Sequence, residues 1–164
     1  MLKKTDTQLT NGLLYQLLKL TNRLMAPFST HLAHRYRISL NEFRLLMTIG
    51  ELGRSASHEL AELTGVNVMS VSRAVATLER HGRIAVMADP DNRRRNWLTL
   101  TEEGERLYRI MRPQSEKVAG YLFSDLSEQE AALLEKLVGR LIETLEATDE
   151  QGRSRFLEAT RPDR

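Results

Sequence analysis

The chain has 164 residues, a length that suits one domain or one domain with an appended subdomain. Hydrophobic residues make up 41% of it and charged residues 28%, a balance typical of a soluble, helix-rich protein, and no apolar run approaches the roughly 20 residues needed to span a bilayer. The absence of cysteine excludes disulfides, thiolate metal sites and thiol-based redox sensing.

Charge is distributed unevenly along the chain. Residues 1–101 contain 14 Lys and Arg against 8 Asp and Glu, whereas residues 102–164 contain 10 against 14. The basic front part indicates a polyanionic partner. The N-terminal MLKKTDTQLT lacks the apolar core of a secretory signal, so we expect a cytoplasmic protein with no membrane partner.

The sequence carries no pattern that indicates catalysis or a bound metal. It contains no glycine-rich phosphate loop, no nucleophile with a placed base and no paired carboxylates outside surface helices. His31 and His34 are three residues apart, but we expect partly exposed helix residues there and not metal ligands. We therefore expect a protein that is not an enzyme and needs no cofactor.

The first predicted element is a long helix over residues 8–36. Its apolar residues recur every three or four positions, as one buried stripe requires. They are Leu13, Leu17, Leu20, Leu24 and Phe28. Pro27 should kink or break this helix, because it removes a backbone donor and crowds the preceding turn.

A capping box opens the next predicted helix. Ser39 stands at the cap and Glu42 three residues on, and the helix should end at Gly53. Its buried face is expected to consist of Phe43, Leu46, Met47 and Ile49.

Residues 57–80 predict a helix-turn-helix. Ser57 is placed to cap a short helix, Gly65 lies in a tight turn, and Asn67 is placed to cap a second helix that runs to about Arg80. In the second helix, Val71, Val75 and Leu78 recur at helical spacing and should face inward.

Two strands with a charged tip follow. RIAVMA at 83–88 and RNWLTL at 95–100 are typical of paired strands, and the turn sequence DPDN at 89–92 lies between them. Arg93, Arg94 and Arg95 then stand together at or near the tip of a hairpin. Because three like charges repel one another, we expect a negatively charged partner to meet them. This hairpin is the wing of a winged helix-turn-helix.

The remaining chain predicts two helices and a polar tail. A helix should run over residues 102–123, bent at Pro113, and Ser127 and Glu130 form a second capping box. The helix that this box opens has a broad apolar face. Its members are Leu133, Leu134, Leu137, Val138, Leu141, Ile142 and Leu145. Residues 148–164 are either a flexible tail or a final helical turn docked through Phe156 and Leu157.

The segment LAELTGVNVMSVSRAVATLERHGRI, followed by DPDNRRRNWLTLTEEG, resembles the MarR family, the multiple-antibiotic-resistance type of bacterial transcription regulator. Members typically read LAE-x-TG, then a Thr/Ser-Arg recognition helix ending in LE-x-x-G, then a DP-x-D-RR wing that closes with LTEEG. The resemblance covers residues 10–146. Asn92 departs from it, because Asp usually stands there and braces a wing arginine; Asp89 and Asp91 are the possible substitutes. Arg95 also departs, because a small apolar residue is common at that position.

The resemblance implies a mainly α fold with a small β-hairpin wing. Residues 37–101 would form the winged helix-turn-helix, residues 1–36 and 102–147 a helical dimerisation region, and residues 148–164 a polar tail. It also implies a homodimer on double-stranded DNA with a pseudo-palindromic operator, expected to be a repressor released by a small, often aromatic and anionic, ligand. The alternative is a winged-helix protein-interaction module without specific DNA binding.

The expected DNA contacts come from the recognition helix, the wing and the loop before the helix-turn-helix. They are Arg54, Val68, Met69, Ser70, Ser72, Arg73, Arg93, Arg94 and Arg95. Two alternatives stay open: Arg73 pairs with Glu79, and Met69 packs inward.

The residues do not define a ligand pocket. Five side chains stand on elements able to border one, although ordinary helix positions are the alternative for each. They are Tyr15, Arg23, His34, Arg44 and Tyr108. A member of the family that responds to no ligand also remains open.

Overall fold

The computed structural model describes residues 7–92 and 95–162 of the chain. It contains two compact units, of which the first extends to Val118 and the second begins at Ala119. In the part of the chain that the structure describes, no helix has both the length and the apolar character needed to cross a membrane.

The N-terminal helical stretch is interrupted where proline predicted a break. Helix α1 covers Thr7–Leu24, and short helical segments follow: α2 (Ala26–Phe28), a π-helical turn η1 (Ser29–Ala33) and α3 (His34–Tyr36). Pro27 lies in the first turn of α2. A backbone N–H has no intrahelical acceptor at this position, so the proline costs the helix no hydrogen bond. Arg37 ends α3 in the left-handed conformation, with φ of 46°.

Three helices build the helix-turn-helix and its support. Helix α4 (Leu40–Leu52) opens with the predicted Ser39–Glu42 capping box, α5 covers Ser57–Thr64, and α6 covers Val68–Arg80. Gly65 turns the chain between α5 and α6 at φ of 65°, a conformation that glycine adopts without strain. Asn67 caps α6 by accepting a hydrogen bond from the Ser70 N–H at 2.9 Å.

The start of α5 differs from the prediction. Ser57 is the first helical residue and not the cap; Ala56 takes the cap position. Because alanine has no side-chain oxygen, Glu59 reaches back instead, and its Oε2 accepts a hydrogen bond from the Ala56 N–H at 2.8 Å.

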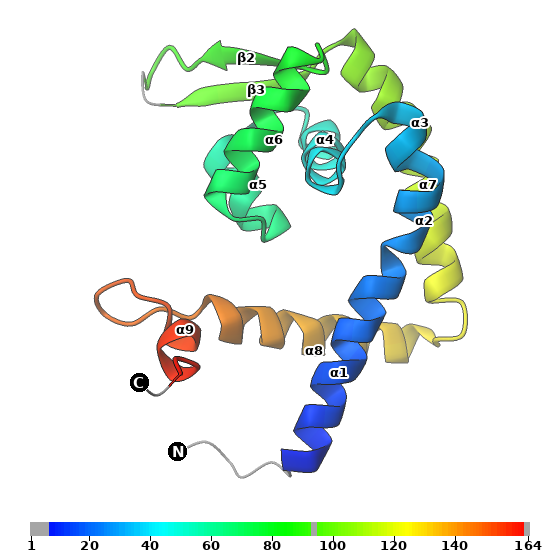
Figure 1. Ribbon diagram of the computed structural model, residues 1–164, viewed down its shortest axis with the longest axis vertical. Coiled ribbons are helices and arrows are strands. Elements are labelled where there is room, and N and C mark those ends of the chain that lie inside the picture. The colour runs from blue at the N-terminus through cyan, green and yellow to red at the C-terminus, as the bar shows by residue number, and fades with distance from the viewer. Residues whose placement is uncertain (1–6, 93–94, 163–164) are drawn as a thin grey trace. The chain divides into compact units, whose positions relative to one another are not determined.

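The wing is part of a three-stranded antiparallel sheet with the order β1-β3-β2. Strands β2 (Ile84–Ala88) and β3 (Asn96–Leu100) form the predicted hairpin, which extends past α6 in Figure 1. The third strand, β1 (Ser55–Ala56), was not predicted, because two residues carry no periodicity. It pairs Ala56 with Trp97 and so fixes the base of the wing to the start of α5.

The core of the first unit lies where α4, α5 and α6 meet the sheet. Leu45, Leu46 and Ile49 of α4 are completely buried, as are Leu60 of α5 and Leu78 of α6. Leu98 of β3 and, from α7 (Glu102–Leu122), Leu107 and Met111 complete this core. The packing therefore holds the outer face of α6 in a fixed orientation relative to the wing.

The close approach of α7 to the sheet depends on a glycine. A Cβ at Gly104 would lie 2.0 Å from the Arg83 carbonyl oxygen, well inside contact distance. Pro113 lies farther along α7 without ending the helix.

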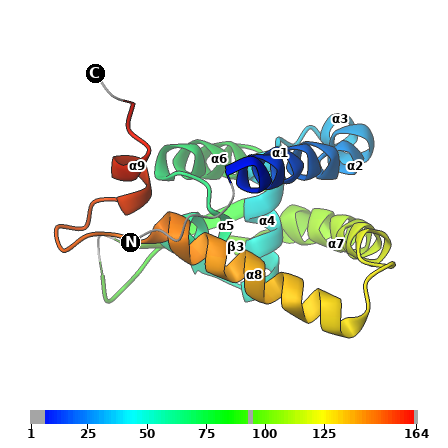
Figure 2. The same cartoon turned by 90° about the horizontal axis from the view of Figure 1, so that it is seen from below.

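The second unit contains α8 (Glu128–Glu146) and α9 (Arg155–Ala159). The predicted Ser127–Glu130 capping box opens α8. Of the two alternatives for the C-terminal residues, the structure has a helical turn, which Ser154 caps, and Figure 2 shows the loop that joins it to α8. Phe156 and Leu157, which were expected to dock this turn, are 41% and 66% exposed.

Candidate nucleic-acid interface

The first turns of α6 present a mixed apolar and polar surface to solvent. Val68 and Met69 are 70% and 66% exposed, which excludes the alternative that Met69 packs inward. Ser72 and Arg73 are also exposed, and Ser70 is partly buried. Val71 and Leu78 on the opposite face are buried, so the helix separates a core face from an outward face.

Arg73 has no carboxylate partner within the described residues. It lies beside Ser39, which caps α4, and Asn41 of α4 along a small polar groove, and Glu79 forms no ion pair with it. Its guanidinium is therefore available to an external acceptor, as the DNA-binding prediction requires.

Backbone hydrogen bonds join the described residues on the two sides of the wing tip. The Asp89 N–H donates to the Arg95 carbonyl at 2.9 Å, and the Arg95 N–H donates to the Asn92 carbonyl at 2.8 Å. Asp89 is buried, and its Oδ1 accepts from the Asp91 N–H at 3.0 Å. Arg93 and Arg94, two of the predicted DNA contacts, lie outside the described residues.

Arg95 folds back onto the base of the wing. Its Nη2 donates to Glu59 Oε1 at 2.5 Å, and its Nε lies 3.9 Å from Asp89 Oδ2. Its guanidinium carbon lies 3.8 Å from the centre of the Trp97 ring. Of the two possible substitutes for the missing family Asp, Asp89 is therefore the one that lies near an arginine of the described residues.

Arg54 shares this aromatic platform. Its guanidinium carbon lies 4.4 Å from the centre of the same Trp97 ring, within the range of a cation–π contact. Arg54 is exposed, so the stack orders its side chain at the surface beside the wing.

Glu59 is a site residue that sequence reasoning missed. The N–H of Ala56 lowers the pKa of Glu59 below its ordinary value of 4.5, and the Ser55 hydroxyl and the Arg95 charge act in the same direction. Glu59 is therefore a carboxylate at neutral pH. The signal available in the sequence was Glu59 in the first turn of a helix, together with Arg95, a third arginine in the wing where a small apolar residue is common.

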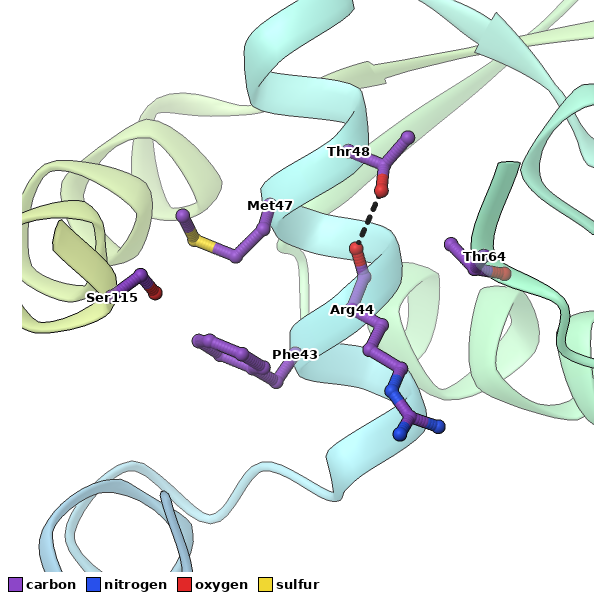
Figure 3. A pocket seen from close by; sticks show the side chains of 6 residues that line it. All are labelled: Phe43, Arg44, Met47, Thr48, Thr64 and Ser115. Atoms are coloured by element: carbon purple, nitrogen blue, oxygen red, sulfur yellow. Dashed lines mark hydrogen bonds between the residues drawn. The ribbon is translucent and has the colours of Figure 1, made fainter. Parts of the chain in front are cut away.

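A cavity of about 340 Å³ lies on α4, away from the outward face of α6. Phe43, Arg44, Met47 and Thr48 of α4 line it together with Thr64 of α5 and Ser115 of α7. Figure 3 shows Phe43 and Met47 on the side of Ser115, and Arg44 and Thr48 on the side of Thr64. Among the five residues considered for a ligand pocket, only Arg44 lines this cavity.

Arg44 brings an uncompensated positive charge to the cavity. Its side chain donates to Asn41 Oδ1 at 3.5 Å and approaches Met25 Sδ at 4.0 Å, and no carboxylate of the described residues pairs with it. The cavity thus combines an aromatic ring, a guanidinium and three hydroxyl groups.

The described residues include no cluster of three or more histidine, aspartate or glutamate side chains able to hold a metal ion. The outward recognition helix, the wing and the supporting α4 instead define the class of protein: a winged helix-turn-helix of the DNA-binding type.

Comparison with known proteins agrees with this class. Residues 38–95 match the model of the MarR family. A helix-turn-helix transcriptional regulator of Bacillus subtilis, YwaE, is 23% identical over 126 residues, which cover 77% of this chain and 74% of the relative.

Solved structures share the fold. Bordetella bronchiseptica BpsR, described with regulation of its DNA binding by 6-hydroxynicotinic acid, superposes with a TM-score of 0.68 at 22% identity, over 79% of this chain and 98% of its own. A cysteine-to-serine mutant of Escherichia coli MarR in complex with operator DNA gives a TM-score of 0.65 at 19% identity, over 84% of this chain and 99% of its own.

The winged helix-turn-helix of this chain belongs to the MarR family. That family consists of DNA-binding transcription regulators that are not enzymes, which is the class predicted for this chain.

Proposed function

We propose that this protein is a homodimeric, sequence-specific transcriptional repressor that a small aromatic anion releases from its operator in the cytoplasm. The observation that carries the proposal is the outward face of α6, where Val68, Met69 and Ser72 are exposed beside Arg73, which forms no ion pair with a described residue. A buried opposite face and a wing on the same rigid core support it.

The exposed residues of α6 match the chemistry of the major groove. Arg73 is suited to donate to O6 and N7 of guanine or to a phosphate, and the Val68 and Met69 side chains are suited to contact thymine methyl groups. Ser70 and Ser72 supply hydroxyl contacts. Arg93 and Arg94 of the wing, with Arg54 at its base, would then contact phosphates or enter the adjacent minor groove.

The case for a dimer lies in two apolar faces, one in each compact unit, that the described residues of the same unit leave exposed. In α1, Leu13, Leu17 and Leu20 are each between 43% and 50% exposed, and in α8, Leu137 and Leu141 are 45% and 50% exposed. Contiguous leucine faces of this kind indicate an interface, because exposing them to water costs free energy. We propose that a second copy of the chain covers both.

The α4 cavity supports the effector part of the proposal. Phe43 offers a ring for stacking, and Arg44 offers a guanidinium that pairs with no carboxylate of the described residues. BpsR, whose DNA binding responds to 6-hydroxynicotinic acid, shares the fold. A ligand here would act only if it bound one dimer geometry more tightly than the other.

The test of DNA reading is a matched pair of variants on one helix. Arg73→Ala should weaken binding to a selected operator by about 1–3 kcal/mol, or roughly 5- to 150-fold. Arg80→Ala removes an equal charge from the other end of α6 and should change the affinity far less. Equal effects of the two variants would contradict the assignment of Arg73.

A salt titration separates this function from a protein-interaction module. DNA binding through several arginines weakens steeply as salt rises, because each neutralised phosphate releases counterions. Binding that ignores salt, or no binding to any duplex at low ionic strength, would favour the interaction module.

A further inference from the structure

The base of the wing contains a small charged cluster built around the single tryptophan of the chain. Two guanidinium groups, from Arg54 and Arg95, lie over the Trp97 ring at 4.4 and 3.8 Å from its centre. Two carboxylates, Glu59 and Asp89, lie near Arg95. With all four groups ionised, the cluster has no net charge.

Glu59 divides its two oxygens between two tasks. Oε2 accepts hydrogen bonds from the Ala56 N–H at 2.8 Å and the Ser55 hydroxyl at 3.0 Å, which secures the start of α5 and strand β1. Oε1 accepts from Arg95 Nη2. One carboxylate therefore joins the helix-turn-helix to the first residue before β3.

The contact between the Arg95 side chain and the second carboxylate, Asp89, is weaker. Asp89 Oδ2 is 3.9 Å from Arg95 Nε, beyond hydrogen-bond distance, and this buried nitrogen has no hydrogen-bond acceptor among the described residues. The side chain is 31% exposed, so solvent and any bound DNA can compete for it. Of the two carboxylates, Glu59 is thus the one that fixes the position of the Arg95 guanidinium.

We propose that Glu59 is a positioning residue that holds Arg95 against Trp97 and withholds it from the DNA phosphates. Arg95 then links the wing to α5 through its ion pair with Glu59, and it is not a third phosphate contact beside Arg93 and Arg94. This inference rests on the proposed DNA-binding function.

The first test needs no DNA. Since Trp97 is the only tryptophan, its indole N–H gives one resonance in a two-dimensional nitrogen–proton NMR spectrum of the full chain. Glu59→Gln keeps a side-chain oxygen for the Ala56 N–H but lacks a second acceptor for Arg95, so this resonance should shift. Arg95→Lys, which keeps the charge and loses the planar group, should shift it as well.

Glu62→Gln is the matched control. Glu62 is exposed on the same helix and forms no ion pair with a described residue, so its neutralisation should leave the Trp97 resonance in place. An unchanged resonance in both Glu59→Gln and Arg95→Lys would overturn the proposal.

The second test measures the affinity for a selected duplex against salt. Released Arg95 should steepen the slope of log K against log salt by about 0.9 per bound subunit in Glu59→Gln, since one more phosphate is neutralised. Glu62→Gln should not steepen it, and the double variant Glu59→Gln/Arg95→Ala should return to the wild-type slope. Arg95→Ala alone should leave the slope unchanged.

Two outcomes separate this inference from the proposed function. A flatter slope in Arg95→Ala alone would overturn the inference while DNA binding stands, because it would make Arg95 a phosphate contact already. If the wild type binds no duplex, the proposed function fails, and with it the claim that Arg95 is withheld from phosphates. The tryptophan resonance still tests the other claim, that Glu59 positions Arg95.

Discussion

Arg83 is a buried, charged residue whose removal we expect to destabilise the first unit strongly. It lies just after α6, is 7% exposed, and pairs with the buried Glu42 across 3.5 Å. Its Nη2 and Nη1 also donate to the carbonyls of Tyr36 and Arg37 at 2.6 and 3.2 Å. Arg83→Ala would therefore leave the buried Glu42 carboxylate without its ion-pair partner. The carbonyls of Tyr36 and Arg37, at the end of α3, would lose the hydrogen bonds that Arg83 donates.

The magnitude follows from this burial. Removing one partner of a buried ion pair costs about 3–5 kcal/mol, because the remaining charge stays desolvated and unpaired. The distance of 3.5 Å is long for such a pair, and Glu42 also accepts a hydrogen bond from the Ser39 N–H at 3.4 Å, so we expect the lower end, about 3 kcal/mol.

Urea unfolding at one fixed protein concentration measures this loss, since dimerisation makes apparent stability depend on concentration. Arg106→Ala is the control, because Arg106 pairs with Glu103 on the exposed surface of α7, where solvent screens the pair. A loss below about 1 kcal/mol in Arg83→Ala, comparable to an exposed pair, would refute the reasoning.

Three further predictions concern the interface, the effector and pH. Leu141→Glu places a charge on the exposed apolar face of α8 and should convert a dimer into a monomer in sedimentation equilibrium, whereas an unchanged mass would show that this face is not the interface. Arg44→Ala should abolish the release of operator DNA by aromatic acids while leaving DNA binding intact, and release that persists would place the effector elsewhere. Hydrogen bonding lowers the pKa of Glu59 in the folded protein. The Glu59 carboxylate therefore stabilises the fold at pH values above its ordinary pKa of 4.5, and this stabilisation is lost as the pH falls through the lower pKa of the folded state. Trp97 fluorescence should change in that acidic range. His58 and Arg95 face the same carboxylate, and a transition that survives in Glu59→Gln would assign it to another group.

Local signals in the sequence predicted most helix boundaries. The capping boxes at Ser39 and Ser127, the Asn67 cap and the glycine turn at Gly65 act through neighbouring residues, so their outcome does not depend on the rest of the fold. The prediction of Ser57 as a cap was wrong for an instructive reason. A glutamate inside the helix supplied the missing acceptor, which left the cap position to alanine.

Long-range features were not available from local patterns. Glu59 and Arg95 are 36 residues apart, and they meet only because the two-residue strand β1 pairs with β3. Likewise, spacing predicted Phe43 and Met47 on the buried face of α4, but both are only partly buried, whereas Leu45, which spacing did not predict, is completely buried. Which face of a helix is covered depends on its neighbours, and sequence periodicity reports only that a face exists.

The residues predicted to contact DNA show what local patterns provide and what they leave open. The sequence placed Val68, Met69 and Arg73 on the first turns of a recognition helix but left open whether Met69 pointed inward and whether Arg73 was paired. The packed core of α4, α5 and β3 settles the orientation of α6, and with it the exposure of these side chains.

The central claim is that two copies of this chain bind one duplex through paired recognition helices. Selection of bound sequences from random duplex DNA by the purified protein tests it most directly. We predict an enriched pseudo-palindrome whose half-sites lie about 34 Å apart, one helical turn, with two chains bound per duplex. Enrichment of a single unpaired half-site, or no enrichment at low ionic strength, would contradict the account.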